Sequence, residues 1–467
     1  MQVHLKTLGC RLNEAELETW ARQFRQLGHG ITADPGCADL LVINTCAVTG
    51  EAVRKSRQLI RRAQKNNPQA KLVVSGCYAS LNPDAVDAIP GVDLLVDNRQ
   101  KDRLPALVNE QLCDAIMPVI ATEPGENPLF SRGRQRAFIK VQDGCRYRCT
   151  FCIVTRARGE ERSRPVDDIV DEINALHAQG ISEAVITGVH LGGYGSDLDV
   201  DLHDLVTAIL ERTGIPRLRL GSLEPWDIPD NFWELFDNTR LMPHLHLPLQ
   251  SGSDTVLRRM ARRCKTADFS ALVASAREQV PQLNITTDII VGFPGETAGE
   301  WQQTLDYLRD FDFGHIHIFA YSPRPDTKAA GLPNPVPEEI KKARSRELHA
   351  LLDIMRQRQL DRQVGQTVPV LVEHFSDGRY WGYTPNYIRV GFEAGAQSEP
   401  LESRILVIGI TAVADDQGVL VGKATSAPGS RTPHHPSEHA WRVSRNQSTQ
   451  ATSPGSAGAF ISIRTEP

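Results

Sequence analysis

The sequence predicts an α/β protein with an N-terminal open parallel sheet flanked by helices, a central partial barrel of six strand–helix units, and a small C-terminal all-β barrel. Strand-length apolar runs alternate with amphipathic helical segments in two series, and the hydrophobic period then changes to two. A length of 467 residues allows about three domains at ~150 residues each. The expected domains are residues 1–121, 131–361 and 362–423, followed by a tail over 424–467.

The first series lies in the expected domain 1–121. Residues 13–26 predict a helix, because apolar side chains recur three and four positions apart along one face. A second helix is expected at 50–65. The alternating strands are expected at residues 3–8, 40–43, 72–75 and 94–96. Strands that alternate with helices in this way form a parallel sheet.

The second series follows a polar stretch with Pro and Gly at residues 122–134, which predicts a linker. A closed barrel of this type needs eight strand–helix units. Six expected strands therefore favour an open, partial barrel. The strands are expected at residues 137–141, 184–187, 217–220, 244–249, 284–291 and 315–321, with helices at 166–178, 202–213, 267–279 and 300–311.

The last part of the chain changes character. A long charged helix is expected at residues 337–363, and apolar residues then alternate over 367–423, which predicts a small β barrel. Beyond Ala424 the chain is rich in Ser, Thr, Pro and Gly, so a disordered tail is expected.

The charge balance alone indicates no nucleic-acid binding, because 52 basic against 57 acidic residues give −5. Two segments differ from this mean. Residues 131–164 hold ten Arg and Lys against three acidic residues, and residues 54–65 hold six against none. Such stripes concentrate a polyanion at one face, or are simply solvated helix surface. No apolar run of ~18 residues and no leader sequence is present, which predicts a cytoplasmic protein without a membrane partner.

Three cysteines stand close together at the start of the second series. Cys145, Cys149 and Cys152 form a CxxxCxxC pattern. Three thiolates on one short loop ligate three irons of a [4Fe–4S] cluster and leave the fourth iron open to a small molecule. Structural zinc is the alternative, but it takes four ligands and no fourth stands near in the sequence. The loop follows the first barrel strand, at the end where such barrels hold their active sites.

Three further cysteines each follow a predicted strand of the N-terminal sheet: Cys10, Cys46 and Cys77. Because the ends of parallel strands meet at one edge of a sheet, these side chains are expected to converge. They predict a second three-cysteine cluster site. Three separately buried structural cysteines are the alternative.

The CxxxCxxC pattern, with Phe151 before its last cysteine, resembles the signature of radical S-adenosylmethionine enzymes. With the three scattered cysteines, the chain resembles the methylthiotransferases, members of that group with two clusters, from about residue 3 to residue 423. The C-terminal β module resembles the TRAM domain, an RNA-binding barrel. The segments that carry the resemblance are TLGCRLN, NTCAVT, SGCYAS, QDGCRYRCTFC, ARGEERSRP, TGVHLGGYG, LPLQSGSDTVLRRM, TDIIVGFPGET and YSPRPDT.

The resemblance implies two [4Fe–4S] clusters and S-adenosyl-L-methionine as cofactors. Cys145, Cys149 and Cys152 would be the catalytic cluster ligands, where reductive cleavage of one S-adenosylmethionine yields a 5′-deoxyadenosyl radical. A second S-adenosylmethionine would methylate sulfur at the cluster of Cys10, Cys46 and Cys77. Cofactor contacts are expected at Phe151, Gly188, Glu224, Gln250 and Asp288. For Asp288, a paired structural carboxylate is an equal alternative.

The resemblance also implies partners: the anticodon stem-loop of tRNA, an electron donor such as flavodoxin or ferredoxin, and a sulfur donor. Short motifs favour the branch that converts N6-threonylcarbamoyladenosine beside the anticodon into its 2-methylthio derivative. The alternatives are the branch that modifies isopentenyladenosine in tRNA, the branch that modifies a ribosomal-protein aspartate, and a metal-bearing RNA-binding protein that is not an enzyme.

Basic and aromatic residues near the expected site predict RNA contacts, because cations hold phosphates and aromatic rings stack on bases. Alternation places some of the aromatic residues inside the barrel instead. The expected contacts are Arg156, Arg158, Arg162, Arg164, Arg379, Trp381 and Tyr387. Two sites depart from the family pattern: Thr155 and Arg156 stand where a Pro–aromatic pair is usual, and Asp326 stands where Gly is usual.

Overall fold

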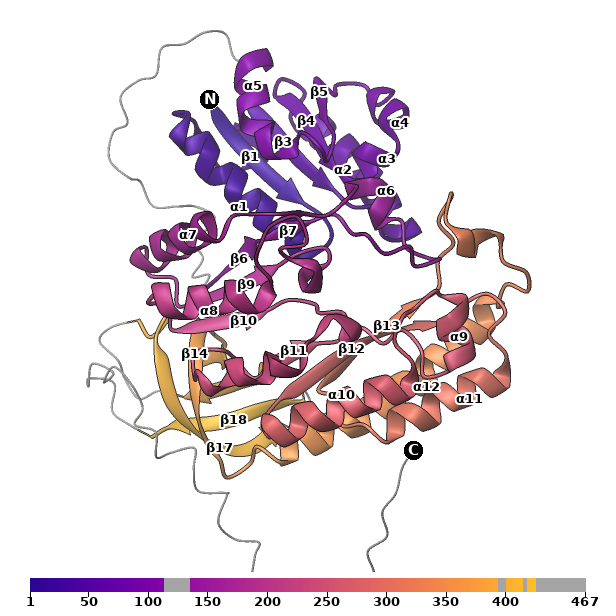
Figure 1. The fold of residues 1–467 in the computed structure, drawn as a ribbon. Coiled ribbons are helices and arrows are strands. Elements are labelled where there is room, and N and C mark those ends of the chain that lie inside the picture. The colour runs from indigo at the N-terminus through magenta and orange to yellow at the C-terminus, as the bar shows by residue number, and fades with distance from the viewer. Residues whose placement is uncertain (113–134, 394–399, 415–417, 426–467) are drawn as a thin grey trace, which may run out of the picture. The chain divides into compact units, whose positions relative to one another are not determined.

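The N-terminal part contains a five-stranded sheet in the order β2-β1-β3-β4-β5, with every pair parallel (Figure 1). Strand β2 was not predicted, because it spans two residues, too few for alternation to be visible in the sequence. The other four are the predicted ones. The strands are β1 (Gln2–Thr7), β2 (Gly30–Ile31), β3 (Leu40–Thr45), β4 (Lys71–Gly76) and β5 (Leu94–Val96).

The structure is a computed structural model that describes residues 1–112, 135–393, 400–414 and 418–425. These residues all belong to one compact unit, Met1–Thr425. The expected linker at 122–134 lies outside the described residues, as does the expected tail except for its first two residues.

Both faces of the N-terminal sheet are buried by helices. Leu40 and Val42 of β3 pack on one face with α1 and α5, while Leu41 and Ile43 pack on the other with α2, α3 and α4. This placement explains why β3 is apolar throughout rather than alternating. The helices are α1 (Arg11–Gln26), α2 (Gly50–Asn66), α3 (Cys77–Leu81), α4 (Pro83–Asp87) and α5 (Leu104–Leu112).

The central part has the six predicted strands, arranged as two parallel sheets in the orders β10-β9-β6 and β11-β12-β13. Isolated bridges, Leu218 to Leu241 and Ser222 to His246, join the sheets between β10 and β11. The predicted partial barrel is therefore confirmed and is composed of two halves. Its strands are β6 (Arg136–Lys140), β9 (Glu183–Thr187), β10 (Arg217–Leu220), β11 (His244–His246), β12 (Asn284–Val291) and β13 (His315–Ala320).

Strand β11 is shorter than the predicted strand over residues 244–249. Pro248 has no N–H to donate to a strand ladder, and Gln250 has a left-handed φ of +79°. The chain therefore leaves the strand after His246 and turns toward the end of the barrel where the CxxxCxxC loop lies.

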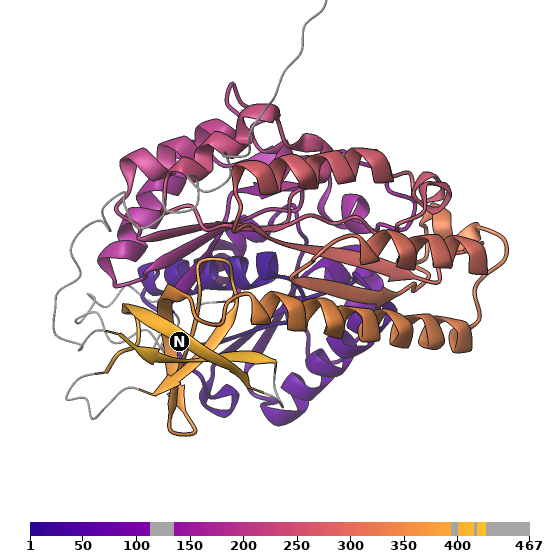
Figure 2. The ribbon, with the colours of Figure 1, turned by 90° about the horizontal axis from the view of Figure 1, so that it is seen from below.

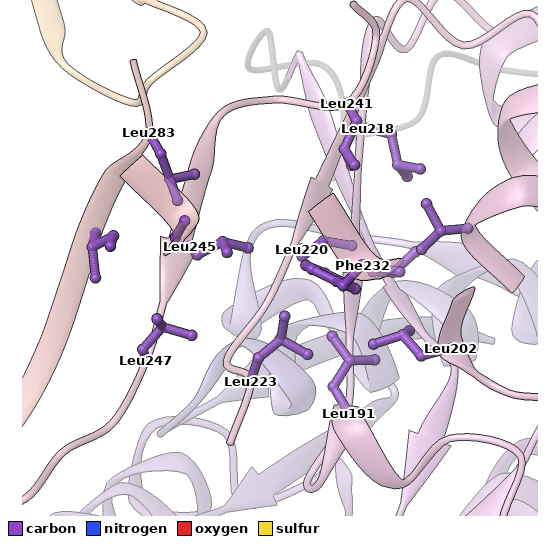
Figure 3. Close-up of a cluster of buried hydrophobic side chains, with 14 of the residues drawn as sticks. Leu191, Leu202, Leu218, Leu220, Leu223, Phe232, Leu241, Leu245, Leu247 and Leu283 are labelled. Carbon is purple, nitrogen blue, oxygen red and sulfur yellow. The ribbon is translucent and has the colours of Figure 1, made fainter. Parts of the chain in front are cut away.

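Helices cover the outer face of the barrel strands. Leu218, Leu220, Leu245 and Leu247 point toward this layer and form its buried core (Figure 3). The long helix predicted at residues 337–363 is observed as α12. The helices are α7 (Val166–Ala178), α8 (Leu202–Arg212), α10 (Thr266–Gln279), α11 (Ala298–Arg309) and α12 (Glu338–Asp361). Short elements at the strand ends are β7 (Gln142–Asp143), α6 (Val154–Arg158), β8 (Arg162–Ser163) and α9 (Asp254–Arg259).

The C-terminal part is a closed five-stranded barrel in the order β14-β15-β16-β18-β17, as predicted (Figure 2). Its backbone carbonyls accept hydrogen bonds from two buried arginines of β10, for example Arg217 to Pro369 at 2.8 Å and Arg219 to Pro385 at 3.1 Å. Its strands are β14 (Thr367–Ser376), β15 (Arg379–Tyr383), β16 (Arg389–Glu393), β17 (Ile405–Ala414) and β18 (Val419–Ala424). No helix in the described part of the chain combines the length and apolarity that a bilayer span requires.

Candidate active site

The CxxxCxxC loop, which we call the loop site (Cys145, Cys149 and Cys152), connects β7 to α6. It begins at Gly144, whose φ of +77° is left-handed. A Cβ atom at this position would lie 1.8 Å from the carbonyl oxygen of Glu160, so only glycine fits directly before Cys145. The glycine turn directs the chain out of β7 and across the end of the barrel.

The thiols of the loop site influence one another. Burial, with smaller contributions from the thiols of Cys152 and Cys149, raises the pKa of Cys145 to about 12. Burial likewise raises the pKa of Cys152 to about 11, with a contribution from Cys149. Neighbouring thiols with such values remain protonated at neutral pH unless a cation replaces the protons. The donor set therefore fits a metal cluster.

The second set, which we call the sheet-edge site (Cys10, Cys46 and Cys77), lies at the carboxyl ends of three adjacent strands, β1, β3 and β4. Two of the cysteines follow glycines with left-handed φ, +115° at Gly9 and +96° at Gly76. A Cβ atom on Gly9 would lie 2.9 Å from Sγ of Cys46. The strand ends thus bring together residues that are distant in the sequence, as predicted.

The sheet-edge thiols also affect one another's pKa. Although Cys10 is exposed, desolvation raises its pKa, and the Cys77 thiol adds to the rise. Burial raises the pKa of Cys46, with contributions from both Cys10 and Cys77. The thiols of Cys10 and Cys46 therefore fit a cation here for the same reason as at the loop site. Cys46 and Cys77 are buried, as the structural alternative also expects, and the second cluster site stays a prediction.

A buried arginine connects the surroundings of the two sites. Arg158 donates to Asn13 at 2.8 Å and to Glu16 at 2.9 Å, on the sheet side, and to Asp143 at 3.0 Å, two residues before Cys145. Lys101, also fully buried, lies 3.4 Å from the Asp143 carboxylate. Five polar groups of the N-terminal and central parts therefore form one buried network.

The position of Arg158 corrects the expectation that it contacts RNA. Its side chain is only 2% exposed, so no phosphate reaches it. Burial opposes its charge, but Glu16 and the thiols of Cys77 and Cys10 are among the groups that raise its pKa. Arg158 is thus a fixed positive charge beside the sheet-edge site.

The loop site has its own arginine. Arg262 donates to Sγ of Cys149 at 3.8 Å and to the Glu224 carboxylate at 2.7 Å. Glu224 was predicted as a cofactor contact, and the structure places it against the loop site through this ion pair. Phe151 lies near Phe293, with ring centroids 6.5 Å apart.

The other predicted cofactor contacts lie on strand ends and inner faces of the barrel. Gln250 is buried, and its N–H donates to the carbonyl of Asp288 at 2.8 Å. The Asp288 carboxylate lies 3.2 Å from Nε2 of His246, so it is a paired carboxylate. Gly188 follows β9 and packs on Gln142, whose side-chain oxygen would lie 2.9 Å from a Cβ atom there. Their roles toward a cofactor stay predictions.

A charged triad next to Cys145 was missed by the sequence analysis. His190 contacts two carboxylates, Glu161 at 2.5 Å through Nδ1 and Asp227 at 2.6 Å through Nε2. Burial lowers the pKa of His190, but hydrogen bonds to Asp227 and Glu161 outweigh this and raise it. Glu161 also accepts from the backbone of Arg146, and Asp227 accepts from Tyr147 at 2.7 Å. The triad therefore fastens the cluster loop, although its members come from three distant segments.

The arginines predicted to contact RNA near the loop site are partly exposed and ion-paired. Arg156 pairs with Asp326 at 2.8 Å, and Arg164 pairs with Glu172 at 2.7 Å. The Arg162 side chain is 43% exposed. Arg156 and Asp326, the two charged departures from the family pattern, thus contact each other.

In the C-terminal barrel the predicted residues divide into two groups. Arg379 is partly exposed, 3.9 Å from Glu393. Trp381 is buried under Arg389, whose guanidinium lies 4.2 Å from the ring centre. Tyr387 accepts from Arg136 of the central barrel at 2.8 Å. The expectation that Trp381 presents a free ring to RNA is therefore corrected, since its ring is buried. The half-buried Tyr387 ring stacks on Tyr383 and lies 4.6 Å from the Arg219 guanidinium, so its faces are engaged by protein.

Two segments of the chain match known families. Residues 2–97 match a family described as "Uncharacterized protein family UPF0004", and residues 139–308 match the Radical SAM superfamily. The protein is 36% identical over 407 residues to the threonylcarbamoyladenosine tRNA methylthiotransferase MtaB of Bacillus subtilis, covering 84% of this chain and 90% of that relative. It is 37% identical over 406 residues to MtaB of Thermotoga maritima, covering 84% and 91%.

A third relative acts on a different nucleoside, according to its name. The tRNA-2-methylthio-N(6)-dimethylallyladenosine synthase of Staphylococcus haemolyticus is 33% identical over 407 residues, covering 83% of this chain and 79% of the relative. Among solved structures, the radical S-adenosylmethionine methyltransferase TsrM from Kitasatospora setae has a TM-score of 0.50 at 17% identity, covering 68% of this chain and 72% of that one. That likeness concerns the fold alone.

The relatives confirm the resemblance that the motifs indicated. Radical S-adenosylmethionine chemistry implies S-adenosylmethionine and a [4Fe–4S] cluster, for which the loop site offers three thiols. Identities above one third extend over most of both chains. The protein belongs to the radical S-adenosylmethionine methylthiotransferase family.

Proposed function

We propose that the protein converts N6-threonylcarbamoyladenosine in tRNA into its 2-methylthio derivative. The observation that carries the proposal is the pair of three-thiol sites, one at the loop and one at the sheet edge, in a chain whose MtaB relatives bear this activity in their names. A methylthio transfer to an unactivated carbon needs a radical source and a sulfur source. Two separate cysteine sites fit that requirement.

We assign a [4Fe–4S] cluster and S-adenosylmethionine to the loop site, and a second cluster to the sheet-edge site. When bound, these groups supply the electron for reductive cleavage of S-adenosylmethionine and the sulfur that becomes methylated and transferred. Carbon 2 of adenine carries no acidic proton, so acid–base side chains alone do not activate it.

The chain's own residues orient the site. Arg262 donates a charge-assisted hydrogen bond to Sγ of Cys149 and orients that side chain. The Glu161–His190–Asp227 triad holds the backbone and ring of the cluster loop. We propose that Gln250 and Asp288, with Gly188 and Phe151, contact S-adenosylmethionine.

We propose that the partly exposed arginines hold tRNA phosphates, since such contacts position a nucleic acid without reading its sequence. Arg156, Arg162 and Arg164 lie on the segment after the loop site, and Arg379 lies on the C-terminal barrel. The bound element would be the anticodon stem-loop. The reaction also needs a sulfur donor and a one-electron donor, and its tRNA substrate implies a cytoplasmic location.

The proposal is tested by mass spectrometry of tRNA nucleosides from a strain that lacks the gene, with the wild-type gene and a Cys145→Ala gene as complements. We expect the 2-methylthio form to disappear while N6-threonylcarbamoyladenosine accumulates. Wild-type complementation should restore the product, and Cys145→Ala should not. Loss of the methylthiolated isopentenyladenosine instead would assign the protein to that branch, and no change in either nucleoside would refute a tRNA substrate.

A further inference from the structure

The segment of residues 322–329 follows β13 and touches the surroundings of both cysteine sites. At its start, Oγ of Ser322 accepts a hydrogen bond at 3.3 Å from the N–H of Gly50, which stands four positions after a cysteine of the sheet-edge site. At its end, the N–H of Ala329 donates to the carbonyl of Thr150, inside the CxxxCxxC loop, at 2.9 Å. We call residues 322–329 the crossing segment, because they extend from one site to the other.

The crossing segment carries a buried arginine, Arg324. This residue stands between two exposed prolines, Pro323 and Pro325, but is itself only 8% exposed. Each proline fixes its own φ, and the Arg324 carbonyl accepts hydrogen bonds from the N–H of Thr327 at 3.2 Å and from its Oγ1 at 2.8 Å. The backbone around Arg324 is therefore a fixed turn that holds the side chain inside the protein.

Arg324 lacks a counter-charge in the part of the chain that the structure describes. Within those residues its guanidinium makes no ion pair and donates no hydrogen bond, and its Nε is buried without an acceptor. A buried charge is costly unless it is paired, so such a group normally has a partner or binds a ligand. By contrast, the buried arginines Arg158 and Arg262 each pair with a carboxylate. An anion that is not part of the protein would complete the surroundings of Arg324.

The surroundings of Arg324 indicate which anion this is. Burial lowers the pKa of Arg324, and the Cys46 thiol opposes that shift. The hydrogen bond between Ser322 and Gly50 also places the crossing segment beside the end of β3, directly before Cys46. Three cysteine ligands leave one iron of a [4Fe–4S] cluster open to a further ligand. The sulfur that is methylated and transferred in the proposed reaction is an anion when it binds iron, and a guanidinium forms charge-assisted hydrogen bonds with anions.

From these observations we infer that Arg324 binds the anionic sulfur ligand of the sheet-edge site, as hydrosulfide before methylation and as methanethiolate after it. The inference rests on the proposed function, because it requires a cluster with an open iron at Cys10, Cys46 and Cys77. A carboxylate is the competing anion, since the threonylcarbamoyl group of the proposed substrate carries one. The position of the crossing segment beside the strand end that carries Cys46 favours sulfur.

The test uses the full-length protein after anaerobic reconstitution, with sodium methanethiolate as the probe. A Cys145→Ala parent, which we expect to retain the sheet-edge cluster alone, lets the probe report on one site, and the holoenzyme serves for comparison. Arg324→Met removes the guanidinium, and Arg324→Lys keeps a positive charge. The matched control, Arg54→Met, removes a guanidinium that is 61% exposed and already pairs with Glu51. Electron paramagnetic resonance of the reduced cluster, titrated with the probe, gives the dissociation constant.

We expect Arg324→Met to weaken methanethiolate binding by about tenfold to a hundredfold, the range typical of a hydrogen bond to a charged group. Arg324→Lys should recover part of this loss, because it restores the charge but not the fork of donors. Arg54→Met should bind the probe like the parent. Iron content should stay at about four per chain in every variant, because the inference gives Arg324 no bond to iron.

Unchanged methanethiolate affinity in Arg324→Met would overturn the inference. Loss of iron in both Arg324 variants would assign the residue to cluster assembly and would overturn it too. Unchanged methanethiolate affinity together with weaker binding of N6-threonylcarbamoyladenosine to the holoenzyme would assign Arg324 to the substrate carboxylate instead. A parent that retains no iron would refute the sheet-edge cluster itself, and this inference with it, so failure of the proposed function is distinguishable from failure at Arg324 alone.

Discussion

The loop site and the sheet-edge site hold the same number of cysteines but arise in different ways. At the loop site, eight residues of sequence contain all three thiols. At the sheet-edge site, three strand ends collect Cys10, Cys46 and Cys77 from 68 positions of chain (10–77). The first site depends on the conformation of one loop, whereas the second depends on the order of β1, β3 and β4 in the sheet.

The two sites nevertheless share local devices. A glycine with left-handed φ directly precedes Cys145, as it does Cys10 and Cys77. Each site also has a buried arginine, Arg262 at 3% and Arg158 at 2% side-chain exposure. A glycine turn and a buried arginine therefore occur both at the loop site, formed by one short segment, and at the sheet-edge site, formed by three strand ends. The difference is that Arg158 also ties two parts of the chain together.

The largest expected effect comes from removing one cysteine of each site. Cys145→Ala should abolish S-adenosylmethionine cleavage, because the cluster that supplies the electron is lost. Cys46→Ala should leave that cleavage measurable and abolish methylthiolation. Each variant should lose about four irons per chain, measured by metal analysis after anaerobic reconstitution. If Cys46→Ala also abolished cleavage, the sites would not be separable.

Next in size is the replacement of the two arginines. Arg158→Met removes one of the two buried cations that pair with Glu16 and Asp143 and leaves Lys101 as the other, and breaking a buried pair costs about 3–5 kcal/mol. Arg262→Met leaves one carboxylate, Glu224, without its ion-pair partner. Because the Glu224 side chain is 22% exposed, we expect a loss of about 1–2 kcal/mol in the free energy of unfolding. Urea denaturation of the cluster-free proteins measures both. Equal losses would show that Arg158 does not stabilise the contact between the N-terminal and central parts.

The glycine turns predict a third effect. A Cβ atom on Gly76 would lie 2.3 Å from the carbonyl oxygen of Thr45, directly before Cys46. Gly159 has a similar φ, +78°, but open space around it, so Gly159→Ala should cost only the left-handed strain of about 1–2 kcal/mol. Gly76→Ala should cost more, and should lower iron retention at the sheet-edge site. If the two variants are equally stable, close packing at Gly76 does not position Cys46.

Two buried glutamates should respond to pH with opposite signs. Arg158, Lys101 and Lys140 outweigh the burial of Glu16 and lower its pKa to about 2, below the value of about 4.3 in an unfolded chain. Its stabilisation is therefore complete above that unfolded value and is lost as pH falls toward 2. Burial instead raises the pKa of Glu296 despite Arg344, so its contribution is present at low pH and is lost as pH rises through the folded-state pKa.

Urea midpoints between pH 3 and pH 6 check this difference. Glu16→Gln should make the loss of stability at acid pH less steep. Glu296→Gln should remove the loss of stability that Glu296 causes as pH rises through its folded-state pKa. If the urea midpoint of Glu16→Gln falls at acid pH as steeply as that of the wild type, the buried network at Arg158 does not respond to the charge of Glu16.

Most of the fold and the six cysteines were accessible from the sequence, because strand and helix periods and strand-end positions are local patterns. The strand ends alone placed Cys10, Cys46 and Cys77 at one edge. The triad around His190 was not accessible, since Glu161, His190 and Asp227 belong to segments whose approach depends on barrel closure. The burial of Arg158 was not accessible either. Its basic segment predicts a surface cation, whereas in the structure α1 packs on β6 and Arg158 is buried.

The smallest expected effect concerns the two charged departures from the family pattern, Arg156 and Asp326. Asp326 has a left-handed φ of +66°, which explains why glycine is usual there, and its carboxylate pairs with Arg156 at 2.8 Å. Both side chains are more than half exposed, so their coupling should be only about 0.2–1 kcal/mol.

A double-mutant cycle of Arg156→Ala and Asp326→Gly, with the free energy of unfolding measured at low and high salt, determines this coupling. Asp326→Gly alone should be nearly neutral, because relief of the backbone offsets the lost pair. A coupling of zero at low salt would mean that the contact between Arg156 and Asp326 does not stabilise the fold.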